Sequence, residues 1–322
     1  MNKDIIYSDR IRTAIANMRK SVMTLEAMDV TLEELEMLKK YGFNVIIEKD
    51  NLSAYINTSI INNCEVITLR NTKKSTAKWV ELNDLHVGSI YFAEKDLRYF
   101  LDMARKEKYK YVYIAGDITA GHPKYKKQSD YLNLKTNYEQ ANKVVEILSQ
   151  YPEFEYYAIH GDADCSFETY KEINPLYIIQ SELKAKDIKF HYINDYVANL
   201  VIEGVVKRMV HLKGSKKTYT ISYPMDLHIR KQFENTLDNV SINGENYKLG
   251  FIQFGHIQNN TFDLQGSTYL TSSSGFLFDT ANVLGESTTY PSGKLCRATF
   301  KNGKVLNFSI SIIKMPYDLR DK

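Results

Sequence analysis

The sequence predicts an α/β protein in which two β-sheets pack face to face between flanking helices, preceded by a small α+β domain. Three observations predict this fold class. Strand and helix patterns alternate between residues 78 and 164, which is typical of βαβ units with parallel strands. Strand patterns with few helices follow from about residue 188. Helix patterns and a hairpin pattern precede both regions.

Residues 1–75 are predicted to form a winged-helix-like domain. An amphipathic helix covers residues 10–21, and the capping-box pattern of Thr31 and Glu34 begins a second helix. Residues 43–56 then read as two strands joined by a turn. Helices before a hairpin indicate either a nucleic-acid-binding module or a small interaction domain that binds protein. The segment carries 11 Lys and Arg against 10 Asp and Glu, so no basic character favours nucleic acid.

The second predicted domain spans residues 76–322 and follows a polar linker at residues 71–77. In its first half three strand patterns alternate with two amphipathic helix patterns. The strands cover residues 78–86, 109–117 and 153–164, and the helices cover residues 95–108 and 137–148. Crossover helices of this kind imply parallel strands. Ligands bind at the carboxyl edge of such sheets.

The second half of this domain reads as a mixed β-sheet. Strand patterns occur at residues 189–193, 197–212, 218–223, 247–257 and 267–276. The C-terminal segment reads as a hairpin about Asn302 and Gly303. A parallel half and a mixed half together predict two packed sheets.

Composition and charge exclude several classes of protein. The 322 residues are 43% hydrophobic and 25% charged, with 42 basic against 39 acidic side chains. This balance gives no strong attraction to nucleic acid or to an anionic membrane. Cys64, Cys165 and Cys296 are too far apart for a zinc knuckle or a disulfide framework. No leader peptide or apolar run of ~18 residues is present, so we expect a soluble, cytoplasmic protein without a membrane span.

Side chains that can bind metal follow the predicted strand ends. The central one is Asp117, which follows Gly116 at the end of the apolar run YVYIA. The others are Asp84, His86, Asp162, His211 and His256. Carboxylates and imidazoles together suit Mn²⁺, Fe or Zn²⁺ rather than Ca²⁺. An aspartate shared between two ions can hold them ~3.5–4 Å apart.

This series resembles the calcineurin-like metallophosphoesterase family, whose motifs are D-x-H, G-D, G-N-H-D/E, a single His and G-H-x-H, in that order. The segments WVELNDLHVGS and YVYIAGDIT match the first two motifs closely, and the resemblance covers roughly residues 78–275. It implies a metallophosphoesterase-like sandwich with one or two metals. It also implies that Asp84 and His86 hold the first metal, that Asp117 bridges, and that Asp162, His211 and His256 complete the second.

Two motifs depart from the family pattern. The third reads Gly161-Asp162-Ala163-Asp164, so a carboxylate replaces the metal-binding amide and the family's catalytic histidine is missing. General acid help is typically worth ~10²–10⁴-fold in rate. The last motif ends in Gln258, whose amide oxygen is a weaker ligand for the first metal than imidazole.

His122 and His160 are the candidates to replace the missing catalytic imidazole. The alternative for each is a surface or packing histidine. The loop at residues 121–135 alternates Lys and Tyr and can hold phosphates and stack bases, or it is a solvated loop. Lys213, Lys216 and Lys217 add positive charge after His211, and the second D-x-H string, at Asp226 and His228, is interpreted as accidental.

These residues predict a metal-dependent phosphodiesterase or nuclease that acts on nucleic acid or a nucleotide, with Mn²⁺ as the expected ion. The alternative is a degenerate phosphoesterase domain that serves as a scaffold or as a nucleic-acid-binding subunit without catalysis. Ala163 and Gln258 favour the alternative, whereas the five retained Asp and His residues at strand ends favour the enzyme.

Overall fold

The computed structural model describes residues 9–18, 23–40, 45–48, 53–56, 65–67, 75–123, 129–193, 195–212, 239–242, 245–278, 290–314 and 316. Some sequence predictions lie outside these residues. They are the hairpin turn at 49–51, the strand at 218–223, Asp226 and His228, and Lys213, Lys216 and Lys217.

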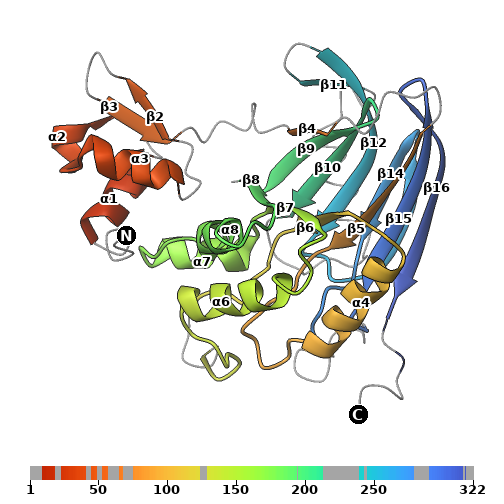
Figure 1. Ribbon diagram of the computed structural model, residues 1–322, viewed down its shortest axis with the longest axis horizontal. Helices are drawn as coiled ribbons and strands as arrows, with labels where there is room; N and C mark the ends of the chain where they lie inside the picture. The colour runs from red at the N-terminus through yellow and green to blue at the C-terminus, as the bar shows by residue number, and fades with distance from the viewer. Residues whose placement is uncertain are drawn as a thin grey trace.

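The N-terminal elements form a three-stranded antiparallel sheet with helices beside it (Figure 1). In chain order they are α1 (Asp9–Met18), β1 (Met23–Thr24), α2 (Leu25–Met28), α3 (Leu32–Lys40), β2 (Val45–Glu48) and β3 (Ser53–Ile56). The predicted capping box is confirmed, because the Thr31 hydroxyl accepts from the Glu34 amide at 3.2 Å and the Glu34 carboxylate accepts from the Thr31 amide at 2.8 Å. Leu35 and Leu38 are buried, whereas Leu32 is 45% exposed.

The first large sheet has the strand order β16-β15-β5-β6-β7-β8. Its parallel strands are β5 (Ser75–Leu82), β6 (Tyr111–Ala115), β7 (Glu155–Ile159) and β8 (Phe190–Ile193), and its C-terminal hairpin is β15 (Gly293–Lys301) and β16 (Lys304–Ile313). Strands β5, β6 and β7 and the hairpin are as predicted, whereas β8, which was predicted in the mixed half, is a fourth parallel strand of this sheet. The linker prediction is wrong at its end, because residues 75–77 pair with β15 as part of β5.

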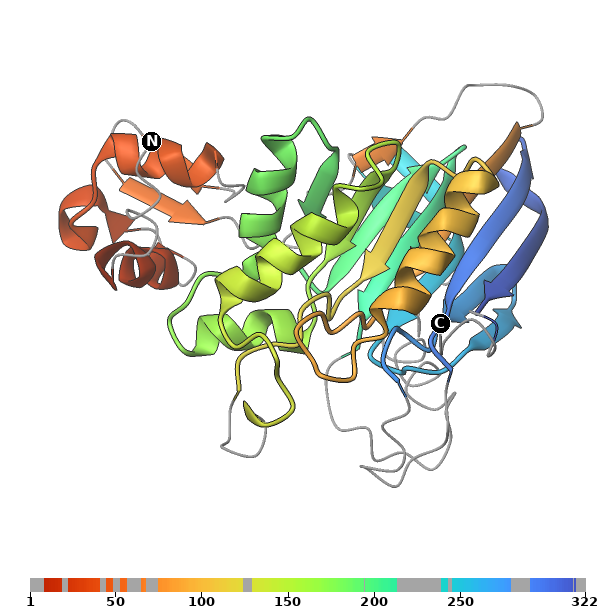
Figure 2. The same ribbon diagram turned by 60° about the horizontal axis from the view of Figure 1, so that its bottom comes forward.

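The described helices of this part of the chain cover one face of the sheet (Figure 2). They are α4 (Glu94–Lys106), α6 (Asn137–Leu148), α7 (Asp162–Thr169) and α8 (Pro175–Lys184). The sequence patterns predicted α4 and α6, whereas α7 and α8 were missed. No helix in the part of the chain that the structure describes is long and apolar enough to cross a membrane.

The second large sheet has the order β13-β14-β12-β10-β9-β4, with β11 paired to β12. Its strands are β4 (Glu65–Ile67), β9 (Val197–Ile202), β10 (Val205–His211), β11 (Asn239–Ile242), β12 (Glu245–Gly255), β13 (Thr261–Gln265) and β14 (Thr268–Ser272). Strand β4 precedes residue 75 in the chain, yet it pairs with β9 at the edge of this second large sheet. The division of the chain into residues 1–75 and 76–322, and the winged-helix character of the first part, remain predictions.

Large side chains from both sheets fill the space between them, so the predicted two-sheet α/β fold is confirmed. These side chains include Trp79, Tyr113, Tyr157, Met209 and Phe251. A second apolar layer, with Phe100, Val112 and Leu176, lies between the helices and the first sheet. Burial of each such side chain stabilises the fold by about 1.5–3 kcal/mol.

An ion pair is buried in the otherwise apolar space between the sheets. Lys207 Nζ lies 2.6 Å from Glu81 Oε1, and the same oxygen accepts from the Trp79 indole at 2.9 Å. Burial alone would raise the pKa of Glu81, but the Lys207 ammonium outweighs burial and lowers the pKa. The Glu81 carboxylate is therefore charged, and the buried Lys294 also lowers its pKa.

Removal of one partner of this pair is expected to destabilise the fold strongly. Lys207→Met leaves the Glu81 carboxylate buried and unpaired, which should lower the free energy of unfolding by about 3–5 kcal/mol. Lys207→Met with Glu81→Leu should recover most of that loss. Urea denaturation measures both, with Lys143→Met at the surface of α6 as a control that should cost less than about 1 kcal/mol. A single variant as stable as the parent chain would contradict the prediction.

Candidate metal centre

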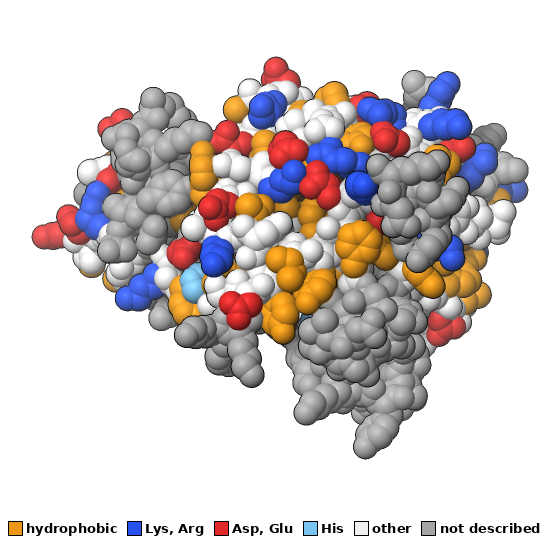
Figure 3. Space-filling view, turned by 90° about the horizontal axis from the view of Figure 1, so that it is seen from below, with side chains coloured by type: hydrophobic (Ala, Val, Ile, Leu, Met, Phe, Trp, Pro, Cys, Tyr) orange, Lys and Arg blue, Asp and Glu red, His pale blue; other side chains and the backbone are white. Residues whose placement is uncertain are grey.

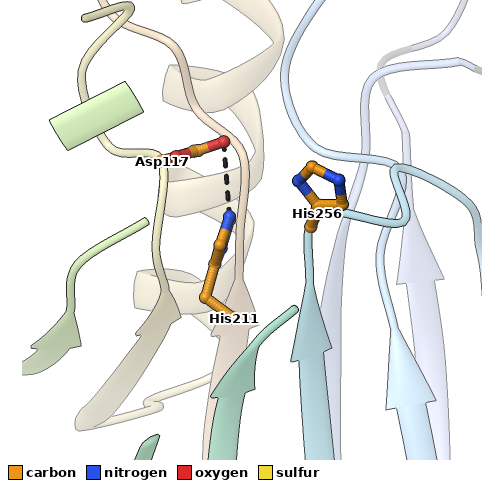
Figure 4. Close-up of side chains that lie close together, drawn as sticks. All are labelled: Asp117, His211 and His256. Atoms are coloured by element: carbon orange, nitrogen blue, oxygen red, sulfur yellow. Dashed lines mark ion pairs between the residues drawn. The ribbon is translucent and has the colours of Figure 1, made fainter. Parts of the chain in front are cut away.

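The ligand-type side chains gather at the edge where the strands of both large sheets end. Asp84 and His86 follow β5, Asp117 follows β6, His211 ends β10, and His256 follows β12. Figure 4 shows Asp117, His211 and His256 converging from their strand ends. The parallel pairings of β5 with β6 and of β10 with β12 bring these residues to one edge.

Asp117, His211 and His256 form the first of two groups whose ligand atoms all lie within 4.8 Å of one another. His211 Nε2 is 3.4 Å from Asp117 Oδ2. Its other ring nitrogen, Nδ1, lies 2.8 Å from the Ala115 carbonyl oxygen, so Nδ1 carries a hydrogen and donates it. The buried Nε2 makes no hydrogen bond and points at Asp117. A neutral imidazole held in this tautomer suits a metal at Nε2.

When no metal is bound, a proton on His211 balances the negative charge of the Asp117 carboxylate. Burial would lower the pKa of His211, but the Asp117 carboxylate outweighs burial and raises that pKa to about 10. Burial would likewise raise the pKa of Asp117, yet the His211 charge lowers it. The carboxylate therefore remains ionised, and the position between the two side chains favours a cation.

Asp84, His86 and Asp117 form the second group. His86 Nε2 lies 3.9 Å from Asp84 Oδ1 and 3.8 Å from Asp117 Oδ2. Asp84 is oriented by Asn83 Nδ2 at 2.5 Å and by the His256 amide at 2.9 Å. The side-chain amide of Gln258 contacts His86 Nε2 at 3.0 Å, which places Gln258 at the same edge. Asp117 is thus common to both groups, as a bridging ligand must be.

Glycine residues precede the ligands because the backbone there has no room for a side chain. A Cβ on Gly116 would lie 2.4 Å from His211 Nδ1, and one on Gly255 would lie 1.9 Å from the Ala115 carbonyl oxygen. The ligand residues themselves adopt left-handed backbone conformations, with φ of 52° at Asp84, 49° at His86, 51° at Asp117, 77° at His256 and 52° at Gln258. Such conformations concentrate at functional sites.

The family model for calcineurin-like phosphoesterases matches residues 78–271. The chain belongs to this family. The family is metal-dependent, and the two groups that share Asp117 are a possible metal site in it.

Solved structures also align with this chain at low sequence identity. Vacuolar Protein Sorting 29 from Cryptosporidium parvum is 12% identical, and the alignment covers 74% of this chain and 99% of that chain with a TM-score of 0.39. A conserved uncharacterized protein from Streptococcus pneumoniae, titled a predicted phosphoesterase, is 9% identical, with 77% and 91% covered and a TM-score of 0.34. No curated protein matches the chain.

The third phosphoesterase motif forms the N-terminus of α7. Asp164 is buried and accepts from the Gly161 amide at 2.9 Å and from the Thr119 amide and hydroxyl at 2.8 and 2.7 Å. It therefore ties α7 to the loop after Asp117. Burial and the Asp117 charge raise the pKa of Asp164 to about 7.

Asp162 lies outside both ligand groups found among the described residues. Its carboxylate is beside the Tyr196 phenol, whose pKa is raised first by burial and then by Cys165 and Asp162. The sequence reasoning missed Tyr196, because the contact joins α7 to the start of β9 and leaves no local pattern. Whether Asp162 or Gln258 binds metal remains a prediction.

The two candidate histidines pack against aromatic side chains. The His122 ring stacks on Tyr170 with a centroid separation of 3.9 Å, and its Nε2 lies 3.6 Å from Glu172. His160 Nδ1 lies 2.7 Å from the Tyr192 hydroxyl, and its ring meets Tyr196 edge-on at 4.4 Å. Neither belongs to the ligand groups found among the described residues, so a catalytic role for either remains a prediction.

Metal affinity is expected to rise with pH. Because the pKa of His211 is raised to about 10, a metal must displace its proton below that pH. The apparent Mn²⁺ affinity should therefore rise about tenfold per pH unit between pH 7 and 8.5. In the metal-free chain, protonated His211 and ionised Asp117 stabilise the fold. Their full contribution to the free energy of unfolding is present below pH 6.5, and it is lost as pH rises through about 10.

Calorimetric titration with Mn²⁺ at several pH values measures this slope. His211→Asn should bind more weakly and show a flatter pH dependence. An affinity for the unmodified chain that does not change over this range would refute the proposed competition between proton and metal.

The close approach at Gly255 gives a second prediction for the site. Gly255→Ala should weaken Mn²⁺ binding by about 10- to 100-fold, because the added carbon displaces Ala115 and His211, which orient the ligand. Gly266→Ala is the matched control, since its Cβ meets nothing within 4 Å and only its φ of 59° is unfavourable. It should lower stability by about 1–2 kcal/mol without changing affinity. Equal affinities for both variants would be evidence against the role of Gly255.

Proposed function

We propose that the chain is a metal-dependent phosphodiesterase or nuclease whose substrate is a nucleic acid or a nucleotide. The observation that carries this proposal is the position of Asp117, which belongs to both ligand groups. One carboxylate between two sets of ligands is the arrangement that holds a pair of ions for in-line attack on phosphorus. The donor set suits Mn²⁺, with Fe and Zn²⁺ as further candidates.

Bound divalent ions would supply Lewis-acid stabilisation of the phosphoryl oxygens and lower the pKa of a water molecule. The chain contributes orientation and charge. Its carboxylates, Asp84 and Asp117, are held by backbone amides, with the Ala163 amide donating to Asp117 Oδ1 at 2.8 Å. His211 is fixed by the Ala115 carbonyl, so its Nε2 already points into the site before a metal displaces the proton there.

Protonation of the leaving group is the step that this site supports least. The Ala163 side chain has no acidic proton, and His122 and His160 are packed on aromatic rings. We infer that esters with acidic leaving groups, such as nitrophenyl esters, are hydrolysed faster than alkyl esters, because they leave without a general acid.

A second candidate function is a metal-binding domain without catalysis, and the side of the site that holds Asp84 and His86 favours it. Gln258 occupies the position of the last histidine of the G-H-x-H motif. Its side-chain amide contacts His86 Nε2. In that case the domain would serve as a scaffold or as a nucleic-acid-binding subunit. We also propose that residues 1–75 form a separate domain that binds nucleic acid or protein.

Hydrolysis of bis(4-nitrophenyl) phosphate with added Mn²⁺ distinguishes the two functions. Asp117→Asn should lower kcat/KM by at least about 100-fold, since both ligand groups lose a charge. Ala163→His should raise kcat for an alkyl phosphodiester by about 10²-fold or more by restoring a general acid. Asp102→Asn on α4, with a side chain 53% exposed, is the matched control and should leave the rate unchanged. Metal binding without any turnover that depends on Asp117 would favour the scaffold.

A further inference from the structure

We propose that an aromatic patch beside the metal centre binds a base of the substrate by stacking. The patch consists of Ile90, Tyr91, Tyr131 and Phe278. This inference rests on the proposed phosphodiesterase function and names its substrate class, a phosphodiester that carries a nucleobase.

Three loops from distant parts of the chain build the patch. The Ile90 amide donates to the Tyr131 carbonyl at 2.9 Å, and the Phe278 amide donates to the Tyr91 carbonyl at 2.8 Å. The rings of Tyr91 and Tyr131 have centroids 5.9 Å apart and planes inclined by 34°. Backbone hydrogen bonds thus hold the aromatic side chains in a fixed arrangement.

Three of the four patch side chains are exposed to solvent, and Tyr91 is half-buried. Ile90 is 50% exposed, and Tyr131 and Phe278 are each 40% exposed. Figure 3 shows hydrophobic side chains gathered in the middle of the face toward which the strands of the metal centre point. Grouped exposed apolar side chains commonly mark a binding site, whereas isolated ones do not.

The patch adjoins the side of the centre formed by Asp84 and His86. Ile90 is four residues after His86, which limits their separation to at most ~14 Å. The Phe276 amide donates to the Asp84 carbonyl at 3.1 Å, and Phe278 follows two residues later. A phosphodiester at the metals therefore has the patch within reach of its neighbouring groups.

The chemistry of the patch fits a base better than it fits a protein. Its side chains carry no formal charge, so the group that they contact should be flat and uncharged. The charged phosphate of the substrate would lie at the metal centre instead. Four side chains are far fewer than the ~20–30 residues that each partner contributes to a stable protein interface. Stacking on an aromatic ring is worth ~5- to 150-fold in affinity per base and tolerates any base.

The test compares two oligomers with the same phosphates. A fluorescein-labelled oligothymidylate and an abasic oligomer of the same length are titrated with the full-length chain carrying Asp117→Asn, which suppresses turnover, in buffer with Mn²⁺. Fluorescence anisotropy should show at least ~10-fold tighter binding of the base-bearing oligomer. A thymidine dinucleotide as competitor shows whether a short nucleotide suffices or a longer strand is required.

Variants assign that preference to the patch. Tyr91→Ala with Tyr131→Ala should reduce the preference to less than about twofold, whereas Tyr91→Phe with Tyr131→Phe should keep it, because stacking needs the ring and not the hydroxyl. Tyr138→Ala on α6, at a tyrosine that is 41% exposed outside the patch, is the matched control and should also keep it. The phenylalanine variant guards against loss of folding in the alanine variant.

The proposal is overturned if both oligomers bind equally, if neither binds, or if the alanine variant keeps the preference. Failure of the proposed function is distinguishable, since it appears as absent turnover of bis(4-nitrophenyl) phosphate by the chain with Asp117 intact. If the base-bearing oligomer binds more tightly but the chain shows no such turnover, the patch would still be a binding site. The chain would then be a nucleic-acid-binding scaffold rather than an enzyme.

Discussion

The close approach of the two large sheets at their metal-binding edge is the constraint on which the rest of the structure depends. The second sheet reaches the backbone of the first through side-chain hydrogen bonds. His211 Nδ1 donates to the Ala115 carbonyl at 2.8 Å, and the buried Gln253 amide donates to the carbonyls of Leu82 at 2.8 Å and Tyr113 at 3.2 Å. Hydrogen bonds of this length fix the sheet spacing to a few tenths of an ångström. Because Asp117 follows a strand of the first sheet while His211 and His256 lie at strand ends of the second, that spacing also fixes the geometry of this ligand group.

The same close approach makes the site unfavourable when it holds no cation. Asp84, Asp117 and Asp164 are buried near one another, and burial of like charges is costly. A proton on His211 compensates part of that charge, and a metal at the same position would compensate more. Asp84, Asp117 and His256 also hold left-handed backbone conformations, which concentrate at functional sites. A cation at this edge would compensate the buried carboxylates, whether or not catalysis follows.

The sequence pointed to the members of both ligand groups because each lies at or just after the end of an apolar strand, and that position is a local feature. It missed α7 although its signal was local too, since Asp164 lies three residues after Gly161 as an N-terminal capping residue should. The contact of Tyr196 with α7 and the pairing of β4 with β9 could not be predicted. Both are nonlocal, and a three-residue strand has no periodicity that assigns it to a sheet. The aromatic packing of His122 and His160 is nonlocal for the same reason.

The two sides of the centre differ, and the difference bears on how a substrate would be held. The His211 side has an imidazole oriented by the Ala115 carbonyl, whereas the His86 side has Gln258 where an imidazole would bind more strongly. The aromatic patch lies on that weaker side. Binding energy from a remote part of a substrate can position its reacting group. A base stacked on Tyr91 and Tyr131 would therefore help to position the phosphodiester on the side where the metal ligands are weakest. The function could then persist although Gln258 replaces an imidazole.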